Sequence, residues 1–276
     1  MKSIHVVADT LPMAWEQAVL RCWNEGDEFS TQYDKEGDPP SKDVAALIHV
    51  KDPFAEPRIH RAFPGGLNDL EKYRSEVLYG VHDHWCDPDA GKWEYTYHER
   101  LFDYDGIDQI GKVIDMLKEC GFTRRAQAIT WKPADDLYCS DPPCLQKMWF
   151  RVQDNKLNMS IVIRSNCGYK AAFMNMLAFT ELQQWVAQQV GVEVGSYVHY
   201  AESFHVYGSY FDEFKGFLDT VKNRPVEDRV WNTDFAIPFF LDGCDEILKE
   251  TDLPEDKRLL VVKRKEYLQN KLSDIS

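Results

Sequence analysis

The chain has 276 residues, of which 44% are hydrophobic and 13% aromatic, enough for a single domain with a large core over residues 1–276. Its formal net charge of −14 argues against a nucleic-acid partner, because binding a phosphate backbone usually needs a basic surface. No run approaches the roughly 20 apolar residues of a membrane span, and no signal peptide is recognisable. Seven irregularly spaced cysteines suggest no disulfide framework. We therefore expect a cytoplasmic protein with reduced thiols and no membrane partner.

The first part of the chain predicts two helices separated by a loop and a strand. Residues 11–23 predict a helix with one apolar face, and Gly26 follows its end. Residues 24–43 are rich in Asp, Glu, Lys, Gly and Pro, which is typical of a polar loop. A strand is predicted over 44–50, and helical spacing returns over 66–79.

The next segment is rich in aromatic residues. Aromatic and polar residues alternate over 93–97, which predicts a short strand with one aromatic face. An apolar stripe over 107–117 predicts a helix, with Gly121 as its C-cap. Residues 126–131 predict another strand.

The remaining elements complete a mixed pattern of strands and helices. Residues 145–153 and 157–164 predict a hairpin, and the largely apolar segment 171–190 predicts a buried helix. A strand at 195–201 and a helix near 210–221 follow, before a charged, lysine-rich end. This order of elements favours an α+β fold, although only loosely.

Three short motifs carry the functional signal. They are Ser140-Asp-Pro-Pro-Cys144, Arg164-Ser165 and His205-Val206-Tyr207. A cysteine beside a cationic group is a candidate nucleophile, because a nearby positive charge favours the thiolate. Arginines also provide the local positive charge with which an acidic protein can hold one phosphate group.

The segment from 123 to 207, about a third of the chain, resembles the thymidylate synthases in order and spacing. This resemblance implies a large bent mixed β-sheet with flanking helices. It also implies a homodimer in which the same sheet face of two subunits packs together and the active sites are shared. The expected binding partners are a pyrimidine nucleoside monophosphate and a folate.

The resemblance assigns the catalytic residues. A pyrimidine is inert at C5 until a nucleophile adds at C6, which makes C5 an enolate-like carbon. Cys144 matches that nucleophile, and Arg164 is the residue that the family places beside it. Glu76 matches the glutamate that organises water and protons around the base, and Tyr97 matches a tyrosine near the proton-transfer step.

The other residues implied by the resemblance contact the nucleotide. They are Arg164 and Ser165 for the phosphate, Arg124 and Arg125 for the same phosphate from the second subunit, His205 and Tyr207 for the sugar, and Asn175 for the pyrimidine edge.

Several positions depart from the synthase pattern. Leu145 replaces a histidine near C4 of the base, and Cys167 stands approximately where an aspartate contacts the folate. Trp85 is a second candidate folate contact. Alignment through Trp85 places His82 near the position where the synthases have a tryptophan that shields the reactive methylene intermediate. A charged tail replaces the apolar C-terminus that closes the site. Both of the last changes favour access of water to the intermediate.

These departures resemble the CMP hydroxymethylases of hydroxymethylpyrimidine antibiotic pathways, in which water quenches the methylene. Lys132 and the small pair Ala171-Ala172 fit a ribonucleotide. Asn175 points the other way, because deoxycytidylate hydroxymethylases carry aspartate there. The expected reaction is conversion of CMP to 5-hydroxymethyl-CMP with 5,10-methylenetetrahydrofolate as cosubstrate. The runner-up is a thymidylate synthase that methylates dUMP.

Two further interpretations are weaker. His82, His84 and Cys86 could suggest a metal site, but no fourth ligand stands at characteristic spacing, so we expect no metal. A catalytically silent nucleotide-binding or RNA-binding relative is the alternative from another class. The joint presence of the cysteine, arginine and glutamate of the catalytic set argues against it.

Overall fold

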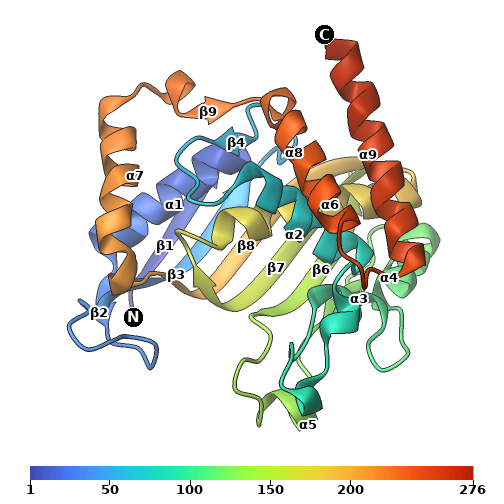
Figure 1. Cartoon of the computed structure of the whole chain (residues 1–276), viewed down its shortest axis with the longest axis horizontal. Coiled ribbons are helices and arrows are strands. Elements are labelled where there is room, and N and C mark those ends of the chain that lie inside the picture. The colour runs from blue at the N-terminus through green and yellow to red at the C-terminus, as the bar shows by residue number, and fades with distance from the viewer. Residues whose placement is uncertain (276) are drawn as a thin grey trace.

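The computed structural model describes residues 1–275 and contains a large mixed β-sheet (Figure 1). Its strands, in spatial order, are β1 (Ser3–Ala8), β3 (Ser41–Val50), β8 (Glu193–Val206), β7 (Lys156–Cys167), β6 (Leu145–Gln153) and β5 (Gln127–Ile129), with β2 (Asp27–Phe29) paired to β3. The β1–β3 and β7–β8 pairs are parallel and the others are antiparallel. The α+β prediction is therefore confirmed.

Helices cover one face of this sheet. Helices α1 (Leu11–Glu25) and α6 (Ala172–Val190) pack directly on its strands. The other α-helices of residues 1–275 are α2 (Leu67–Tyr79), α3 (Tyr97–Phe102), α4 (Gln109–Glu119), α5 (Pro133–Asp136), α7 (Phe211–Asn223), α8 (Thr233–Leu248) and α9 (Glu255–Ile275). A small ribbon pairs β4 (Ile59–His60) with β9 (Val230–Trp231). Helix α6 contacts β7 and β8 on one side and α1, α2 and α4 on others, which explains why it is apolar around most of its circumference.

Most elements with a clear apolar period were predicted correctly. The β6–β7 hairpin turns at Asp154 and Asn155, whose φ angles of 52° and 58° suit the turns that join antiparallel strands. Gly26 lies at the end of α1, where its N–H donates to Cys22 O over 2.9 Å. The charged end of the chain is helical as α9, and β1 and α8 are elements that the sequence did not reveal.

Three local predictions were wrong. Residues 93–96 form no strand, because the Thr96 hydroxyl accepts the Glu99 N–H at 3.0 Å and starts α3 at Tyr97. Gly121 is not a C-cap: α4 ends earlier, and the Gly121 carbonyl accepts the Val152 N–H. The polar 24–43 segment is only partly loop, because β2 and the start of β3 pair within it.

The sheet face opposite the helices is uncovered in the single chain. Strand pairing aligns two rows of side chains on it: Lys147, Val162, Tyr200 and Leu47 in one, and Trp149, Ser160, Val198 and His49 in the other. These rows mix apolar and polar groups, and Leu47 is 38% exposed. An extended, partly apolar sheet face of this kind is suited to packing against another protein surface.

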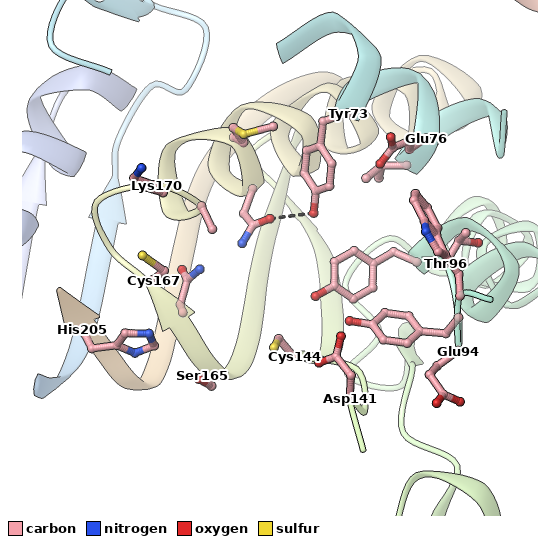
Figure 2. Close-up of a pocket in the computed structure, with 18 of the residues that line it drawn as sticks. Tyr73, Glu76, Glu94, Thr96, Asp141, Cys144, Ser165, Cys167, Lys170 and His205 are labelled. Carbon is pink, nitrogen blue, oxygen red and sulfur yellow. Dashed lines mark hydrogen bonds between the residues drawn. The ribbon is translucent and has the colours of Figure 1, made fainter. Parts of the chain in front are cut away.

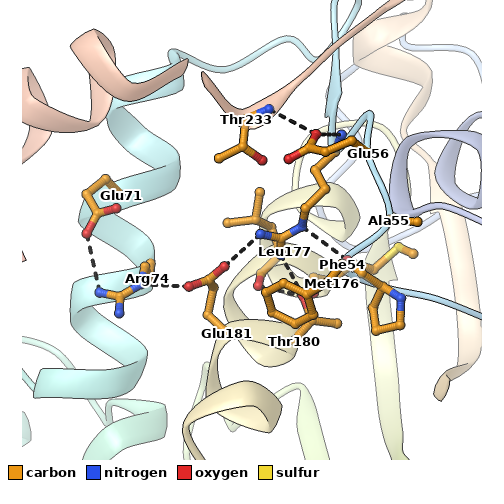
Figure 3. A network of polar contacts seen from close by, with 12 residues as sticks. Phe54, Ala55, Glu56, Glu71, Arg74, Met176, Leu177, Thr180, Glu181 and Thr233 are labelled. Atoms are coloured by element: carbon orange, nitrogen blue, oxygen red, sulfur yellow. Dashed lines mark hydrogen bonds and ion pairs between the residues drawn. The ribbon is translucent and has the colours of Figure 1, made fainter. Parts of the chain in front are cut away.

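A buried ion-pair network joins segments distant in sequence (Figure 3). Glu181 on α6 accepts from Arg58 at 2.9 Å and from Arg74 on α2 at 3.2 Å. Arg264 on α9 donates to both oxygens of Glu71, at 2.9 and 2.8 Å. Burial alone would raise the pKa of Glu181, but the surrounding arginine charges outweigh it and lower this pKa to about 2.

Replacing the central carboxylate should destabilise the fold. We expect Glu181→Gln to lower the free energy of unfolding at pH 7 by about 3–5 kcal/mol, because buried Arg58 loses the carboxylate it pairs with and Arg74 keeps only its pair with Glu71. Urea denaturation measures this loss. Asp212→Asn, which breaks the exposed pair with Lys215, is the control and should leave stability unchanged.

The acid dependence provides a second readout. Folding lowers the pKa of Glu181. The ionised side chain therefore contributes its full amount to the free energy of unfolding above the ordinary glutamate pKa, and this contribution is lost as pH falls toward about 2. The stability gap between wild type and Glu181→Gln should therefore narrow on acidification. A constant gap across that range would contradict this assignment.

Candidate active site

A cleft of about 690 Å³ opens where α2, the start of α6 and the ends of β6, β7 and β8 meet (Figure 2). Eight of the predicted site residues line it: Glu76, Tyr97, Cys144, Ser165, Cys167, Asn175, His205 and Tyr207. The volume is within the range of small-molecule sites. The fold thus brings together side chains that are widely separated in the sequence.

Cys144 stands directly before β6, and the neighbouring strand β7 fixes its backbone. The Arg164 N–H donates to Cys144 O at 2.8 Å, and the Arg164 guanidinium Nε donates to Pro143 O at 3.1 Å. Arg164 therefore supports the loop that carries the cysteine and is not itself part of the cleft wall described for residues 1–275.

The charge balance at Cys144 differs from the expectation. Burial raises the pKa of the Cys144 thiol, Arg164 lowers it, and Asp141 raises it, so the pKa in the single chain lies above its ordinary value. Arg164 thus acts in the expected direction, but burial is the larger effect. Formation of the thiolate would be favoured by additional positive charge near the cleft.

Buried phenols form one wall of the cleft. The Tyr97 hydroxyl accepts the Leu145 N–H at 3.1 Å, and the Tyr73 hydroxyl donates to Asn175 Oδ1 at 2.6 Å, the contact dashed in Figure 2. Burial raises the pKa of both Tyr73 and Tyr97 well above the usual value, so both remain neutral. Because Tyr73 occupies Oδ1, the Asn175 amide nitrogen is available as a donor to a ligand.

His205 presents a buried polar atom without a partner. The Ser203 hydroxyl donates to Asp43, so it can accept from His205 Nδ1, 3.2 Å away. Nδ1 then carries the proton, and Nε2, which has no hydrogen-bond partner in the described chain, is an acceptor. Burial lowers the pKa of His205 to about 4, which keeps the ring neutral. A hydroxyl donor would satisfy Nε2.

Other predicted contacts lie outside the cleft. Lys132 Nζ contacts Asp105 at 2.6 Å and Glu99 at 3.6 Å, so its charge is already paired. Ala172 is fully buried, and its neighbour Ala171 lines the cleft instead. Neither Lys132 nor Ala172 is among the cleft-lining residues found within 1–275.

The predicted arginine pair is exposed. Arg124 and Arg125 immediately precede the segment that leads into β5, and the Arg124 carbonyl accepts Trp149 Nε1 at 3.0 Å. Trp149 belongs to the uncovered sheet face, so the pair lies beside that face. The arginines are not on the cleft wall of their own chain, as far as residues 1–275 define it.

Trp93, not Trp85, lines the cleft. Trp85 stacks on His82 with ring centroids 3.8 Å apart, and its edge contacts Trp93 at 5.1 Å. His82 is buried and is not among the residues within 1–275 that line the cleft. The sequence did not reveal Trp93, because the 80–96 segment has little regular structure from which to place a side chain.

Other cleft residues were missed for similar reasons. Tyr73 lies on the helix predicted over 66–79, where its helical spacing gave no sign of a role in a site, and it lines the cleft. Tyr95 shares the two-residue period of Tyr97, which was the available signal. Lys170 and Asp141 also line the cleft, and only their proximity to Cys167 and Cys144 in sequence could have indicated them.

Residues 1–275 contain neither a cluster of metal-ligating side chains nor a helix suited to a membrane. No three His, Cys, Asp or Glu side chains within this range are grouped as metal ligands. His82 and His84 instead face carboxylates. None of the helices in the same range is long and apolar enough to cross a bilayer.

Comparisons with known proteins agree with this geometry. The sequence profile of the family described as Thymidylate synthase matches residues 67–229, so the chain belongs to the thymidylate synthase family. Members of this family are one-carbon transferases that act at C5 of a pyrimidine with methylenetetrahydrofolate.

Individual relatives support this membership. Proteins named "Putative thymidylate synthase" from Methanocaldococcus jannaschii and Methanopyrus kandleri are 29% and 31% identical over 204 and 201 residues. These matches cover 70% and 72% of the chain and 86% and 90% of the relatives. The solved thermostable thymidylate synthase A from Bacillus subtilis has a similar fold, with a TM-score of 0.59 and 22% identity over 75% of this chain and 83% of that one.

Asp141 offers a direct test of the charge balance at the cysteine. We expect Asp141→Asn to speed alkylation of Cys144 at pH 8 by about threefold, because removing a nearby negative charge lowers the thiol pKa by roughly half a unit. Iodoacetamide labelling followed by peptide mass spectrometry separates Cys144 from the other cysteines. Asp135→Asn, an exposed neutralisation on α5, should leave the rate unchanged. An unaltered rate in Asp141→Asn would contradict the assignment.

Proposed function

We propose that this chain is a folate-dependent pyrimidine-nucleotide C5 hydroxymethylase that converts CMP to 5-hydroxymethyl-CMP. The observation that carries the one-carbon chemistry is the convergence of Cys144, Glu76, Asn175 and His205 on one cleft. Binding and activation of a pyrimidine nucleotide need a nucleophile, a carboxylate, an amide that donates to the base and an acceptor for a sugar hydroxyl.

In this proposal the nucleotide spans the cleft. Its base lies between Cys144 and Asn175, and the Asn175 amide donates to an acceptor on the base edge. A sugar hydroxyl donates to His205 Nε2, the buried atom without a partner. Tyr207, whose ring is 4.4 Å from that of His205, borders the sugar. Ser165 would contact the phosphate.

The chain's own residues perform the activation. The Cys144 thiolate forms a bond to C6, and the C5–C6 π electrons move to C5 and the adjoining carbonyl or amidine system. Methylenetetrahydrofolate, when bound, supplies the one-carbon unit to C5. The aromatic wall of Trp93 and Tyr95 fits a planar ring in the same cleft. Tyr97 and Glu76 would assist removal of the C5 proton and deliver protons around the base. Tetrahydrofolate would leave the transferred carbon as C5 loses its proton, and addition of water to the resulting exocyclic methylene would expel the Cys144 thiolate and restore the aromatic ring.

Access of water supports hydroxymethylation. No residue after Tyr207 lines the cleft in the described chain, and α9 packs against α8 and α2 instead of covering it. Water could therefore add to the exocyclic methylene. Trp93 on the cleft wall is the specific observation that favours the second candidate, methylation of dUMP, because an aromatic side chain there could exclude water.

The preference for CMP rests on sequence departures and on space. Leu145 is fully buried and supplies no polar side chain near the base. Ala171 is small and lines the cleft, which leaves room beside the sugar. A ribose contact by Lys132 would require its pair with Asp105 to open. Cys167 lies at the cleft edge where a folate could extend.

A homodimer would complete the phosphate site. The partly apolar sheet face supplies a surface for packing two subunits, and the exposed pair Arg124 and Arg125 lies beside it. We propose that each pair reaches the phosphate in the second subunit's cleft. Such charges would also offset the effect of burial on the Cys144 thiol. Free thiols at all seven cysteines fit a cytoplasmic enzyme.

Product analysis separates the two candidate reactions. With methylenetetrahydrofolate and separate CMP, dCMP, UMP or dUMP, we expect fastest turnover of CMP, at least about tenfold above dCMP, because loss of a 2′-hydroxyl leaves a polar group unpaired. In isotopic water the product should contain labelled oxygen and the folate should be released as tetrahydrofolate. A methylated product with stoichiometric dihydrofolate would establish the synthase alternative.

Subunit mixing tests the shared site. Arg125→Ala and Cys144→Ala homodimers should each be inactive, whereas their mixture should regain roughly a quarter of wild-type activity, because half of the dimers are mixed and each has one intact site. Native mass spectrometry verifies the mixed dimers. Absence of recovery in verified mixed dimers would exclude a site built from two subunits.

A further inference from the structure

His82 is sandwiched between two carboxylates and connects the cleft to the C-terminal part of the chain. Its Nδ1 lies 2.9 Å from Glu76 Oε1, and its Nε2 lies 3.1 Å from Glu250 Oε1. Glu76 lines the cleft, whereas Glu250 belongs to residues 249–254, the acidic turn between α8 and α9. The His82 side chain is only 6% exposed.

The geometry fixes the number of protons. Both ring contacts join a nitrogen to a carboxylate oxygen, and each needs one hydrogen between the two atoms. A neutral imidazole has one N–H, so the set of Glu76, His82 and Glu250 must bind one additional proton. Burial disfavours a charged ring, but the two carboxylates outweigh it and raise the pKa of His82.

The surroundings hold this arrangement in place. Trp85 stacks flat on the His82 ring, and its Nε1 donates to Asp252 in the acidic turn at 3.1 Å. Arg258 on α9 donates to the Glu250 carbonyl at 2.9 Å, which fixes the turn. Glu250 Oε2 is buried and has no hydrogen-bond partner within residues 1–275. The contact of His82 with Glu250 Oε1 is therefore the main interaction that offsets the negative charge of this carboxylate. His84 faces Asp252 instead.

We propose that His82 and Glu250 are positioning residues that orient Glu76 and keep a transferable proton beside the cleft. This inference rests on the proposed one-carbon chemistry. In the resting state both His82 nitrogens carry protons and Glu76 is a carboxylate. The Nδ1 proton passes to Glu76 and from Glu76 to the bound nucleotide, so the ring becomes neutral and keeps its Nε2 proton, which it donates to Glu250. Return of a proton through Glu76 restores the imidazolium, so no proton is gained or lost over the cycle.

The protonation state can be measured without turnover. In ¹⁵N-histidine-labelled wild type at pH 7, we expect both ring nitrogens of His82 to carry protons. Glu250→Gln, which preserves shape and removes one negative charge, should lower the pKa of His82 by about one unit. Asp256→Asn is the matched control, because it neutralises an exposed carboxylate at the start of α9 that pairs with Lys257 and contacts neither His82 nor Trp85. A neutral His82 ring in wild type at pH 7 would overturn the proposal.

Release of tritium from C5 of the nucleotide tests the role of the proton. Glu250→Gln should lower kcat on the order of 10²-fold with little change in nucleotide KM, because proton transfer is affected more than binding. The basic limb of its kcat–pH profile should move to lower pH by about one unit. Asp256→Asn should retain the wild-type profile. Equal kcat and pH profiles for Glu250→Gln and Asp256→Asn would refute the positioning role.

Failure of the proposed one-carbon chemistry at C5 would look different. In that case wild type would release no C5 tritium from any of the four nucleotides, whereas the ¹⁵N measurement would still determine whether His82 carries the additional proton. Urea denaturation of Glu250→Gln establishes that the variant is folded before its kinetics are compared.

Discussion

The pairing of β6 with β7 is the constraint on which the site depends. It places Arg164 opposite Cys144, so that the Arg164 backbone N–H donates to the Cys144 carbonyl and the Arg164 guanidinium donates to the Pro143 carbonyl. The strand ends then present Cys144 and Ser165 to the same cleft. A one-residue shift in this register would turn alternate side chains to the opposite face and separate these groups.

Burial sets the chemistry of this cleft as much as charge does. It keeps Tyr73 and Tyr97 neutral, it makes His205 a neutral acceptor, and it opposes ionisation of Cys144. Additional positive charge near the cleft would oppose the effect of burial on Cys144. In the proposed homodimer this charge comes from the exposed arginines of the second subunit, which would also allow a protein with a formal charge of −14 to bind a phosphate.

The sequence predicted elements with strong periodicity and residues within recognisable motifs. The β6–β7 hairpin, helix α6 and the cysteine between Pro143 and Leu145 all follow from local pattern. The 80–96 segment was predicted poorly, because its conformation depends on tertiary contacts such as the hydrogen bond from Trp85 Nε1 to Asp252. Glu250 could not have been placed beside the cleft, since 168 residues separate it from His82 and no local pattern links them.

Covalent trapping tests the central claim most directly. A nucleotide with fluorine at C5 has no proton to lose there, so a Cys144 adduct at C6 should accumulate once methylenetetrahydrofolate has transferred its carbon. Intact-protein and peptide mass spectrometry with 5-fluoro-CMP and 5-fluoro-dUMP would detect and locate it. The account predicts a stoichiometric adduct on Cys144 that is absent from Cys144→Ala. If neither nucleotide forms an adduct, or if the adduct forms at another cysteine, the account is contradicted.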